Sequence, residues 1–230
     1  RALRALGKRV NVACSDPIPP HCLFLMEEDL PQAFEYRQIV AVDVADVKLL
    51  GERLSVYADR IDLCIDHHPS NCVAANLLLV DTEAAAAAEV IYELILLLGV
   101  PLDQQMAVQI YTGISTDSGC FRYSNTTART HRIAAALFEV GFDHAEIDRN
   151  MLETKSHARV RLEQMVLETI EYHFDGMCAL VAVTEEMRQQ SGALESELDG
   201  VSQIPRQIEG VEVGVTLRQK PDGNFKVSVR

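Results

Sequence analysis

The sequence is short of basic residues, and this shortage restricts the partners that it can bind. Its 230 residues include 21 Lys and Arg against 34 Asp and Glu, which gives a formal net charge of -13. Proteins that grip long nucleic acids contact the phosphates with clustered lysine and arginine. The composition therefore argues against long duplex nucleic acid as a partner, and any phosphate ligand is expected to be small or bound through a metal.

Cysteine pairs and membrane-length apolar runs are also lacking. The longest apolar stretch, "AAAAAEVIYELILLLGV", is interrupted by Glu89 and Glu93, which indicates a buried helix and not a membrane span. The cysteines form neither a CxxC pair nor the dense framework of small secreted domains. We therefore expect reduced thiols in a cytoplasmic protein without a membrane partner. The six cysteines are Cys14, Cys22, Cys64, Cys72, Cys120 and Cys178.

What the sequence does contain is typical of a compact α/β protein. Apolar residues make up 48% and charged residues 24%, the profile of a globular chain. Apolar strand-like runs alternate with helical patterns, and such continuous apolar strands are typical of a parallel sheet covered by helices. Strands are expected within residues 8–14, 36–43, 60–68 and 76–81, with helices at 46–59 and from a cap at Asp81 or Thr82 to Gly99.

The second half of the sequence indicates a smaller α/β domain. After helical patterns that continue to residue 174, "MCALVAVT", "EVGVTLRQ" and "NFKVSVR" are strand patterns, and "KPDGN" between the last two is typical of a hairpin turn. We expect a first domain over 1–152, a linker helix over 153–174 and a second, smaller domain over 175–230.

Acidic residues and histidines follow the strand patterns of the first domain. Asp43 ends "IVAV", the run Asp66-His67-His68 ends "DLCI", and Asp117 lies in "GISTDSG". Ligands of parallel α/β sheets lie beyond the carboxyl ends of the strands, so these side chains can converge there. Aspartate and histidine together suit Mn²⁺, with Mg²⁺ or Co²⁺ as alternatives.

Each of these residues also has an ordinary structural interpretation. Asp117 fits a turn in a loop of small residues, and Asp66 fits a turn before Pro69. Adjacent histidines point in different directions, so one can bind metal while the other faces a substrate, or both can lie in a surface loop. Asp66 can instead orient an imidazole as a hydrogen-bond acceptor. The residues alone leave these alternatives open.

Two longer strings carry a resemblance to a known family. "IDHHPSN", preceded by "VAVD" and followed by "GISTDSGCFRYSNTT", resembles the DHH phosphoesterases, specifically their branch of bifunctional oligoribonucleases and phosphoadenosine-phosphate phosphatases. The similarity covers essentially the whole chain. It implies a parallel-sheet domain joined to a smaller substrate-binding domain that closes over the cleft.

The resemblance also implies roles for individual residues. It implies a site for two ions, usually Mn²⁺, in which Asp43 bridges the ions and His67 and Asp117 are further ligands. His68 would lie against the scissile phosphate and Asp66 would support the histidines, both as catalytic residues. Substrate contacts are implied for Asn71, Arg218 and Arg230, although Arg218 also fits a solvated arginine on a strand.

Two parts of the family pattern are expected outside the sequence. An aspartate-rich motif that supplies further ligands should precede Arg1, and a glycine-rich segment with a histidine should follow Arg230. We therefore expect these 230 residues to lack about half of the metal ligands of the resemblance and, by themselves, to show little activity.

The expected function follows from this resemblance. It is a metal-dependent phosphoesterase that hydrolyses short oligoribonucleotides and the 3′-phosphate of phosphoadenosine phosphate with a water activated by two metal ions. The alternatives are a cyclic dinucleotide (c-di-AMP) phosphodiesterase and a noncatalytic nucleotide-binding fragment. The expected partners are short oligonucleotides or nucleotides, and the sequence leaves a homodimer open.

Overall fold

The computed structural model describes residues 1–26, 32–220 and 222–230. The chain divides into two compact units, Arg1–Thr154 and Lys155–Arg230. Each contains its own sheet and its own buried apolar clusters. The expected α/β class, with a parallel sheet in the first unit and a second sheet in a smaller second unit, is confirmed.

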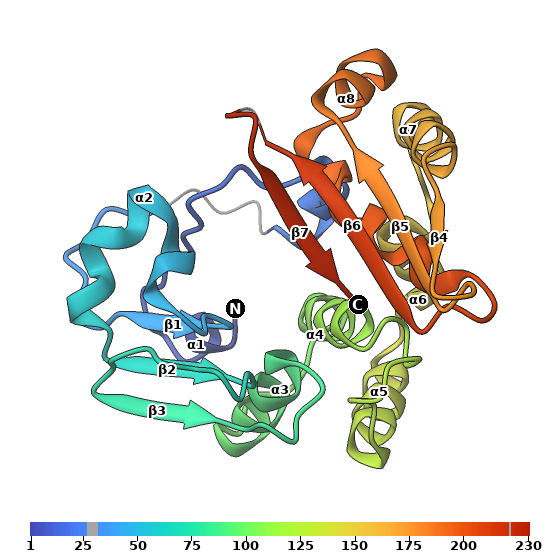
Figure 1. Ribbon diagram of the computed structural model, residues 1–230. Coiled ribbons are helices and arrows are strands. Elements are labelled where there is room, and N and C mark those ends of the chain that lie inside the picture. The colour runs from blue at the N-terminus through green and yellow to red at the C-terminus, as the bar shows by residue number, and fades with distance from the viewer. Residues whose placement is uncertain (27–31, 221) are drawn as a thin grey trace. The chain divides into compact units, whose positions relative to one another are not determined.

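The first unit is built on a parallel sheet with the strand order β1-β2-β3 (Figure 1). The central strand β2 is buried from Cys64 onward, as expected for a continuous apolar strand in a parallel sheet. Its register aligns Leu63 with Leu77 on β3, so the carboxyl ends of the strands meet at one edge. The strands are β1 (Val40–Val42), β2 (Leu63–Asp66) and β3 (Leu77–Val80).

Helices α3, α4 and α5 form the largest apolar cluster of the first unit. Tyr111 and Ile114 of α4 and Leu137 of α5 are almost fully buried there. Asp103 begins α4 as a cap, because its side chain accepts from the backbone N–H of Met106 at 2.8 Å. The helices are α1 (Ala2–Ala5), α2 (Gly51–Leu54), α3 (Ala87–Leu97), α4 (Gln104–Asp117), α5 (Ala128–Val140) and α6 (His144–Asp148).

Three 3-10 helices and one π-helical turn complete the described part of this unit. They are the 3-10 helices Pro20–Leu25, Val47–Leu50 and Ser55–Arg60 and the π-helical turn Arg149–Glu153.

Three local expectations for this unit are wrong. Residues 8–14 form no strand, since none of the described strands pairs with them. The segment 46–59 folds as 3-10 turns around the short α2 and not as one helix. Helix α3 begins at Ala87 and is not capped by Asp81 or Thr82, because the Asp81 carboxylate instead closes a turn onto the N–H of Glu83 at 3.1 Å.

The second unit contains a mixed sheet with the order β4-β5-β6-β7. Strands β5 and β6 are parallel, whereas β4 and β7 join the two edges in the antiparallel sense. Helices α7 (His157–Leu167) and α8 (Glu185–Ser191) accompany the sheet, and Leu162, Val166 and Val181 are fully buried between α7 and β5. The strands are β4 (Glu171–His173), β5 (Cys178–Val183), β6 (Val213–Gln219) and β7 (Phe225–Val229).

Three further 3-10 turns lie between α8 and β6. Their bounds are Glu195–Glu197, Asp199–Gln203 and Pro205–Gln207.

The linker helix expected over 153–174 is corrected in its bounds. Helix α7 ends at Leu167, and Glu171–His173 forms strand β4, paired with β5. The expected helix is too long because the apolar pattern does not show that the chain turns at Thr169. There the Thr169 hydroxyl accepts a hydrogen bond from the backbone N–H of Ala182. Helix α7 contributes to the apolar cluster of the second unit, so it packs as part of that unit.

Among the described residues, no helix combines the length and the apolar character needed to cross a membrane. Each of the six cysteines is free.

Arg129, near the start of α5, connects the end of β3 with α3. Its guanidinium donates to Asp81 Oδ2 at 2.5 Å, and its Nε lies 2.8 Å from a carboxylate oxygen of Glu93 and 3.4 Å from one of Glu89. Glu89 is fully buried, so a positive charge beside it offsets the cost of burying a carboxylate. The hydrogen bond from Arg129 lowers the pKa of Asp81 below its ordinary value of 3.8.

The variant Asp81→Asn is expected to destabilise the protein at pH 7 by about 1.5–3 kcal/mol, since it removes a hydrogen bond between charged groups. The pKa of Asp81 is lower in the folded state than its ordinary value of 3.8. The stabilisation is therefore fully present above pH 3.8 and is lost as the pH falls through the pKa of the folded state. Denaturant unfolding of variant and wild type, followed from pH 7 to pH 3, measures the difference.

The exposed Asp59 provides the control, because no hydrogen bond or ion pair of its side chain occurs in the described chain. Asp59→Asn should leave the free energy of unfolding nearly unchanged. Equal stability of Asp81→Asn and wild type at pH 7, or a difference that persists undiminished at pH 3, would contradict the role given to this ion pair.

Candidate metal centre

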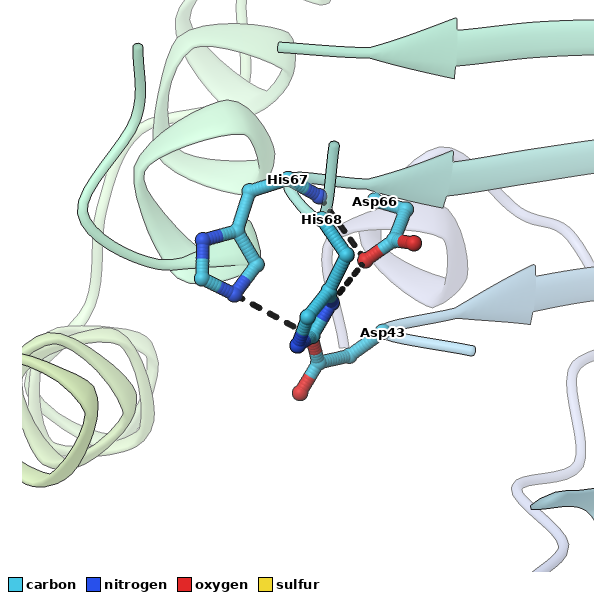
Figure 2. Close-up of side chains that lie close together, drawn as sticks. All are labelled: Asp43, Asp66, His67 and His68. Atoms are coloured by element: carbon cyan, nitrogen blue, oxygen red, sulfur yellow. Dashed lines mark hydrogen bonds and ion pairs between the residues drawn. The ribbon is translucent and has the colours of Figure 1, made fainter. Parts of the chain in front are cut away.

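The carboxyl ends of β1 and β2 bring four of the predicted residues together. Asp43 directly follows β1, Asp66 is the last residue of β2, and His67 and His68 follow it. In Figure 2 dashed lines join the His67 ring to Asp43, and join Asp66 to the backbone nitrogen of His67 and to the His68 ring. Asp117, the last residue of α4, completes the group, since its Oδ2 lies 3.6 Å from Nε2 of His67.

Asp66 is a fully buried carboxylate that orients its neighbours. It accepts hydrogen bonds from the backbone N–H of His67 at 2.8 Å, from Nδ1 of His68 at 2.8 Å and from the Asn71 amide at 2.5 Å. Burial by itself raises the pKa of Asp66, but these hydrogen bonds outweigh burial and hold the pKa below its usual value. Asp66 is therefore ionised, and its oxygens are engaged within the protein.

His67 is held in one orientation by the backbone of residue 84. Its Nδ1 lies 3.1 Å from the carbonyl oxygen of Ala84, which fits an Nδ1–H donor and leaves the lone pair of Nε2 on the other side of the ring. That Nε2 faces Oδ1 of Asp43 at 3.5 Å and Oδ2 of Asp117 at 3.6 Å. Nε2 of His67 thus lies within 3.6 Å of two carboxylate oxygens, and these three donor atoms can bind a cation.

The two carboxylates of this group repel each other. Burial raises the pKa of Asp117, and the negative charge of Asp43 raises it further. Asp43 has φ of 59°, in the left-handed region that costs a non-glycine residue energy. A positive ion between the carboxylates would relieve the repulsion, and the unusual backbone at Asp43 is the kind of local strain that clusters at functional sites.

His68 differs from His67 in its partner. Its Nδ1 bonds to Asp66, and this hydrogen bond raises the pKa of His68. In the part of the chain that the structure describes, Nε2 of His68 has no hydrogen-bond partner. The ring is about half exposed, so it can present a proton to a ligand.

These observations fit a divalent cation bound by oxygen and imidazole. One ligand atom each from Asp43, Asp66, His67 and His68 lies within 4.8 Å of the others. Asp117 lies outside this group of four, but its Oδ2 is 3.6 Å from Nε2 of His67. Because the oxygens of Asp66 and Nδ1 of His68 bond to each other or to neighbouring groups, Asp43, His67 and Asp117 are the candidate metal donors. Mn²⁺, Mg²⁺ and Co²⁺ accept this donor set.

Asn71 is engaged inside the protein. Its amide nitrogen donates to Asp66 and to the carbonyl oxygen of Val44 at 3.0 Å, and its oxygen accepts from the N–H of Val73 at 3.1 Å. A substrate could reach only a remaining lone pair of that oxygen. The structure therefore gives Asn71 a supporting position behind Asp66, and the substrate contact expected for it stays a prediction.

The other two predicted substrate residues lie in the second unit, on the same pocket. Arg218 of β6 and Arg230 after β7 line a pocket of about 210 Å³. Arg218 also forms an ion pair with Glu195. Lys226 of β7 lines this pocket as well, and the sequence reasoning missed it. The antiparallel register, which pairs Arg218 with Lys226, is what brings the third positive charge to this place.

Known proteins provide an independent comparison. The chain is 35% identical over 240 residues to the bifunctional oligoribonuclease and PAP phosphatase NrnA of Thermus thermophilus, covering 100% of this chain and 69% of that protein. It is 27% identical to the protein of the same description from Bacillus subtilis, covering 87% of this chain and 64% of that protein. The chain thus spans about two thirds of the length of these relatives.

The chain is also similar to a solved structure. An exopolyphosphatase-related protein from Bacteroides fragilis has a TM-score of 0.74 and 27% identity, with 83% of this chain and 58% of that chain covered. No model of a protein family matches the sequence.

Binding of Mn²⁺ should depend on His67. Because an ion that binds only the folded state stabilises it by mass action, Mn²⁺ is expected to raise the thermal midpoint of the wild type. It should raise that of His67→Ala much less. The exposed His157, at the start of α7 in the other unit, provides the control, and His157→Ala should respond like the wild type. Equal Mn²⁺ responses of wild type and His67→Ala would rule out this site as the binding position.

Proposed function

Because this chain belongs to the family of bifunctional oligoribonucleases and PAP phosphatases, we propose that it is part of a metal-dependent phosphoesterase for short oligoribonucleotides and phosphoadenosine phosphate. The observation that carries the proposal is the position of His67, whose Nε2 faces the carboxylates of Asp43 and Asp117. A site of this kind is suited to hydrolysis at a phosphate, which carries negative charge.

In this proposal, Asp43, His67 and Asp117 hold the metal, Mn²⁺ in preference to Mg²⁺ or Co²⁺. The family resemblance of the sequence implies two ions in the intact site. When bound, such ions supply Lewis acidity and activate water for attack on the phosphate ester. The hydrogen bond between Nδ1 of His67 and the Ala84 carbonyl supports this role, because it fixes the tautomer whose Nε2 can bind metal.

His68 would act on the phosphate itself. Its Nδ1 is committed to Asp66, and that bond raises the pKa of His68, which favours the protonated ring. Nε2–H could then donate to a phosphate oxygen and stabilise the charge that develops there. Asp66 acts through the two histidines by orienting them, and Asn71 holds the second oxygen of Asp66.

The pocket of the second unit would bind another phosphate or the nucleotide. Arg218, Lys226 and Arg230 surround it, and the Arg218 guanidinium is already oriented by its ion pair with Glu195. Guanidinium groups match phosphate oxygens with paired donors, and the lysine adds a point charge. Arg230 is the residue that we expect to contribute most.

The charge of the chain favours small substrates. A net charge of -13 offers no broad positive surface, so nucleotides and very short strands fit better than long duplexes. A cyclic dinucleotide shares the phosphodiester chemistry and remains the alternative substrate. We further propose a cytoplasmic location, in agreement with the free thiols and with substrates that are nucleotides.

Hydrolysis assays test the proposal directly. The full-length protein with Mn²⁺ is offered a diribonucleotide, phosphoadenosine phosphate and cyclic di-AMP in parallel. Turnover of the first two is expected, and His67→Ala should lower kcat/KM by about 100-fold or more, since changes even to groups that only support metal ligands cost 10–100-fold. The variant His157→Ala should keep full turnover.

The other possible results of these assays distinguish the alternative functions and test the assigned site. Turnover of cyclic di-AMP alone would favour the cyclic dinucleotide phosphodiesterase, and absence of all turnover would favour a nucleotide-binding protein. Equal turnover by wild type and His67→Ala would refute the assigned site.

The second unit is tested in the same assay by Arg230→Ala. If Arg230 binds substrate, KM rises by about 10-fold while the Mn²⁺ response stays unchanged. The exposed Lys220 at the end of β6 is the matched control, and Lys220→Ala should leave KM unchanged. An unchanged KM for Arg230→Ala would remove this residue from the substrate site.

A further inference from the structure

The chain makes an unusual turn directly after Asp117 and the end of α4. Three consecutive residues, Gly119, Cys120 and Phe121, have positive φ values of 56°, 55° and 61°. This left-handed conformation is open to glycine but costs energy for a residue with a side chain. Backbone strain of this kind persists only where the surroundings hold it, and it clusters at functional sites.

Buried and stacked groups hold this turn in shape. The backbone N–H of Cys120 donates to the carbonyl oxygen of Ser115 at 2.7 Å. The backbone N–H of Phe121 donates to the hydroxyl oxygen of Ser118 at 3.0 Å, and Ser118 is fully buried. The ring of Phe121 stacks on His131 of α5, with 5.3 Å between the ring centroids. The turn is therefore fixed, and so is the direction in which the chain leaves it.

The turn returns Asn125 to the end of α4. Its amide nitrogen Nδ2 donates to the backbone carbonyl oxygen of Asp117 at 3.2 Å and to that of Ala85 at 3.0 Å. An amide nitrogen carries two protons, so it can serve two acceptors. Ala85 follows Ala84, whose carbonyl oxygen orients the ring of His67. One side chain thus joins the residue that supplies one candidate metal donor to the loop that orients another.

We propose that Asn125 is a positioning residue of the metal centre, which fixes the distance between the carboxylate of Asp117 and Nε2 of His67. This distance is 3.6 Å. A bound ion holds its ligands at about 2.0–2.6 Å, so a shift of Asp117 away from His67 would weaken binding. The proposal rests on the proposed function, because it takes Asp117 and His67 as metal donors.

Other contacts hold the surrounding helices and loop without Asn125. Helices α3 and α4 approach closely, since a Cβ on Gly113 would lie 2.8 Å from Cβ of Ala88. The ion pair of Arg129 with Asp81 connects α5 to the end of β3. Asn125 itself is exposed. Loss of its amide should therefore leave the unit folded and loosen only the connection between the two carbonyl groups.

Metal binding to the full-length protein is the first test, with the signal of free Mn²⁺ in electron paramagnetic resonance as the readout. Asn125→Ala should raise the dissociation constant for Mn²⁺ by about 10-fold, since groups that support metal ligands are worth about 10–100-fold in affinity. His67→Ala, which removes a donor, should weaken binding more.

Asn76→Ala is the matched control. Asn76 is also exposed, and its amide donates to Oδ1 of Asp62 at 3.1 Å. These two residues directly precede β3 and β2, at the edge of the sheet opposite to the metal centre. The control therefore loses a similar hydrogen bond of the same unit, and it should bind Mn²⁺ like the wild type.

Turnover of a diribonucleotide separates positioning from other roles. Asn125→Ala should need about 10-fold more Mn²⁺ for half-maximal turnover, while KM for the dinucleotide at saturating Mn²⁺ stays unchanged. A substrate contact would instead raise KM. A merely structural role would lower the thermal midpoint of the metal-free protein, and this midpoint should be similar for Asn125→Ala and Asn76→Ala.

Three results would overturn the proposal. If Asn125→Ala binds Mn²⁺ like the wild type while His67→Ala does not, Asn125 has no positioning role and the proposed function stands. If Asn125→Ala and Asn76→Ala weaken binding equally, the effect is a general loss of structure. If His67→Ala binds Mn²⁺ like the wild type, the metal centre itself is wrong, and the role of Asn125 fails with it.

Discussion

The buried carboxylate of Asp66 accepts three hydrogen bonds at the carboxyl end of the central strand β2, and the arrangement of the site depends on it. Burying a carboxylate costs free energy unless its oxygens are hydrogen-bonded or paired with a charge, and at Asp66 the hydrogen bonds come from the groups that have to be oriented. The backbone of His67, the ring of His68 and the amide of Asn71 are held by a single anion. Loss of that anion would release all three at once.

Beside the hydrogen bonds of Asp66, the site contains two carboxylates, Asp43 and Asp117, that repel each other. Asp43 and Asp117 come from different elements, β1 and α4, and both approach Nε2 of His67. The raised pKa of Asp117 records part of the cost of bringing the carboxylates together. Folding therefore brings two carboxylates to the same imidazole nitrogen, and this is the reason we propose a cation, and through it a phosphate, as the ligand.

Much of this was predictable from the sequence because parallel strands have a strict geometry. An apolar run that ends in Asp43, and another that ends in Asp66-His67-His68, must bring their ends to the same edge. The bond of Asn71 to Asp66 and the third pocket charge from Lys226 were not predictable, since they depend on loop conformation and on the register of β6 with β7. The strand expected at 8–14 failed because apolar periodicity does not reveal whether a pairing strand is available.

The central claim is that Asp43, His67 and Asp117 bind one divalent ion, and anomalous diffraction from Mn²⁺-soaked crystals of the protein tests it most directly. The account predicts a manganese peak about 2.2 Å from a carboxylate oxygen of Asp43, Nε2 of His67 and a carboxylate oxygen of Asp117. A peak bound by Asp66 or by His68 instead, or manganese found only outside the first unit, would contradict it.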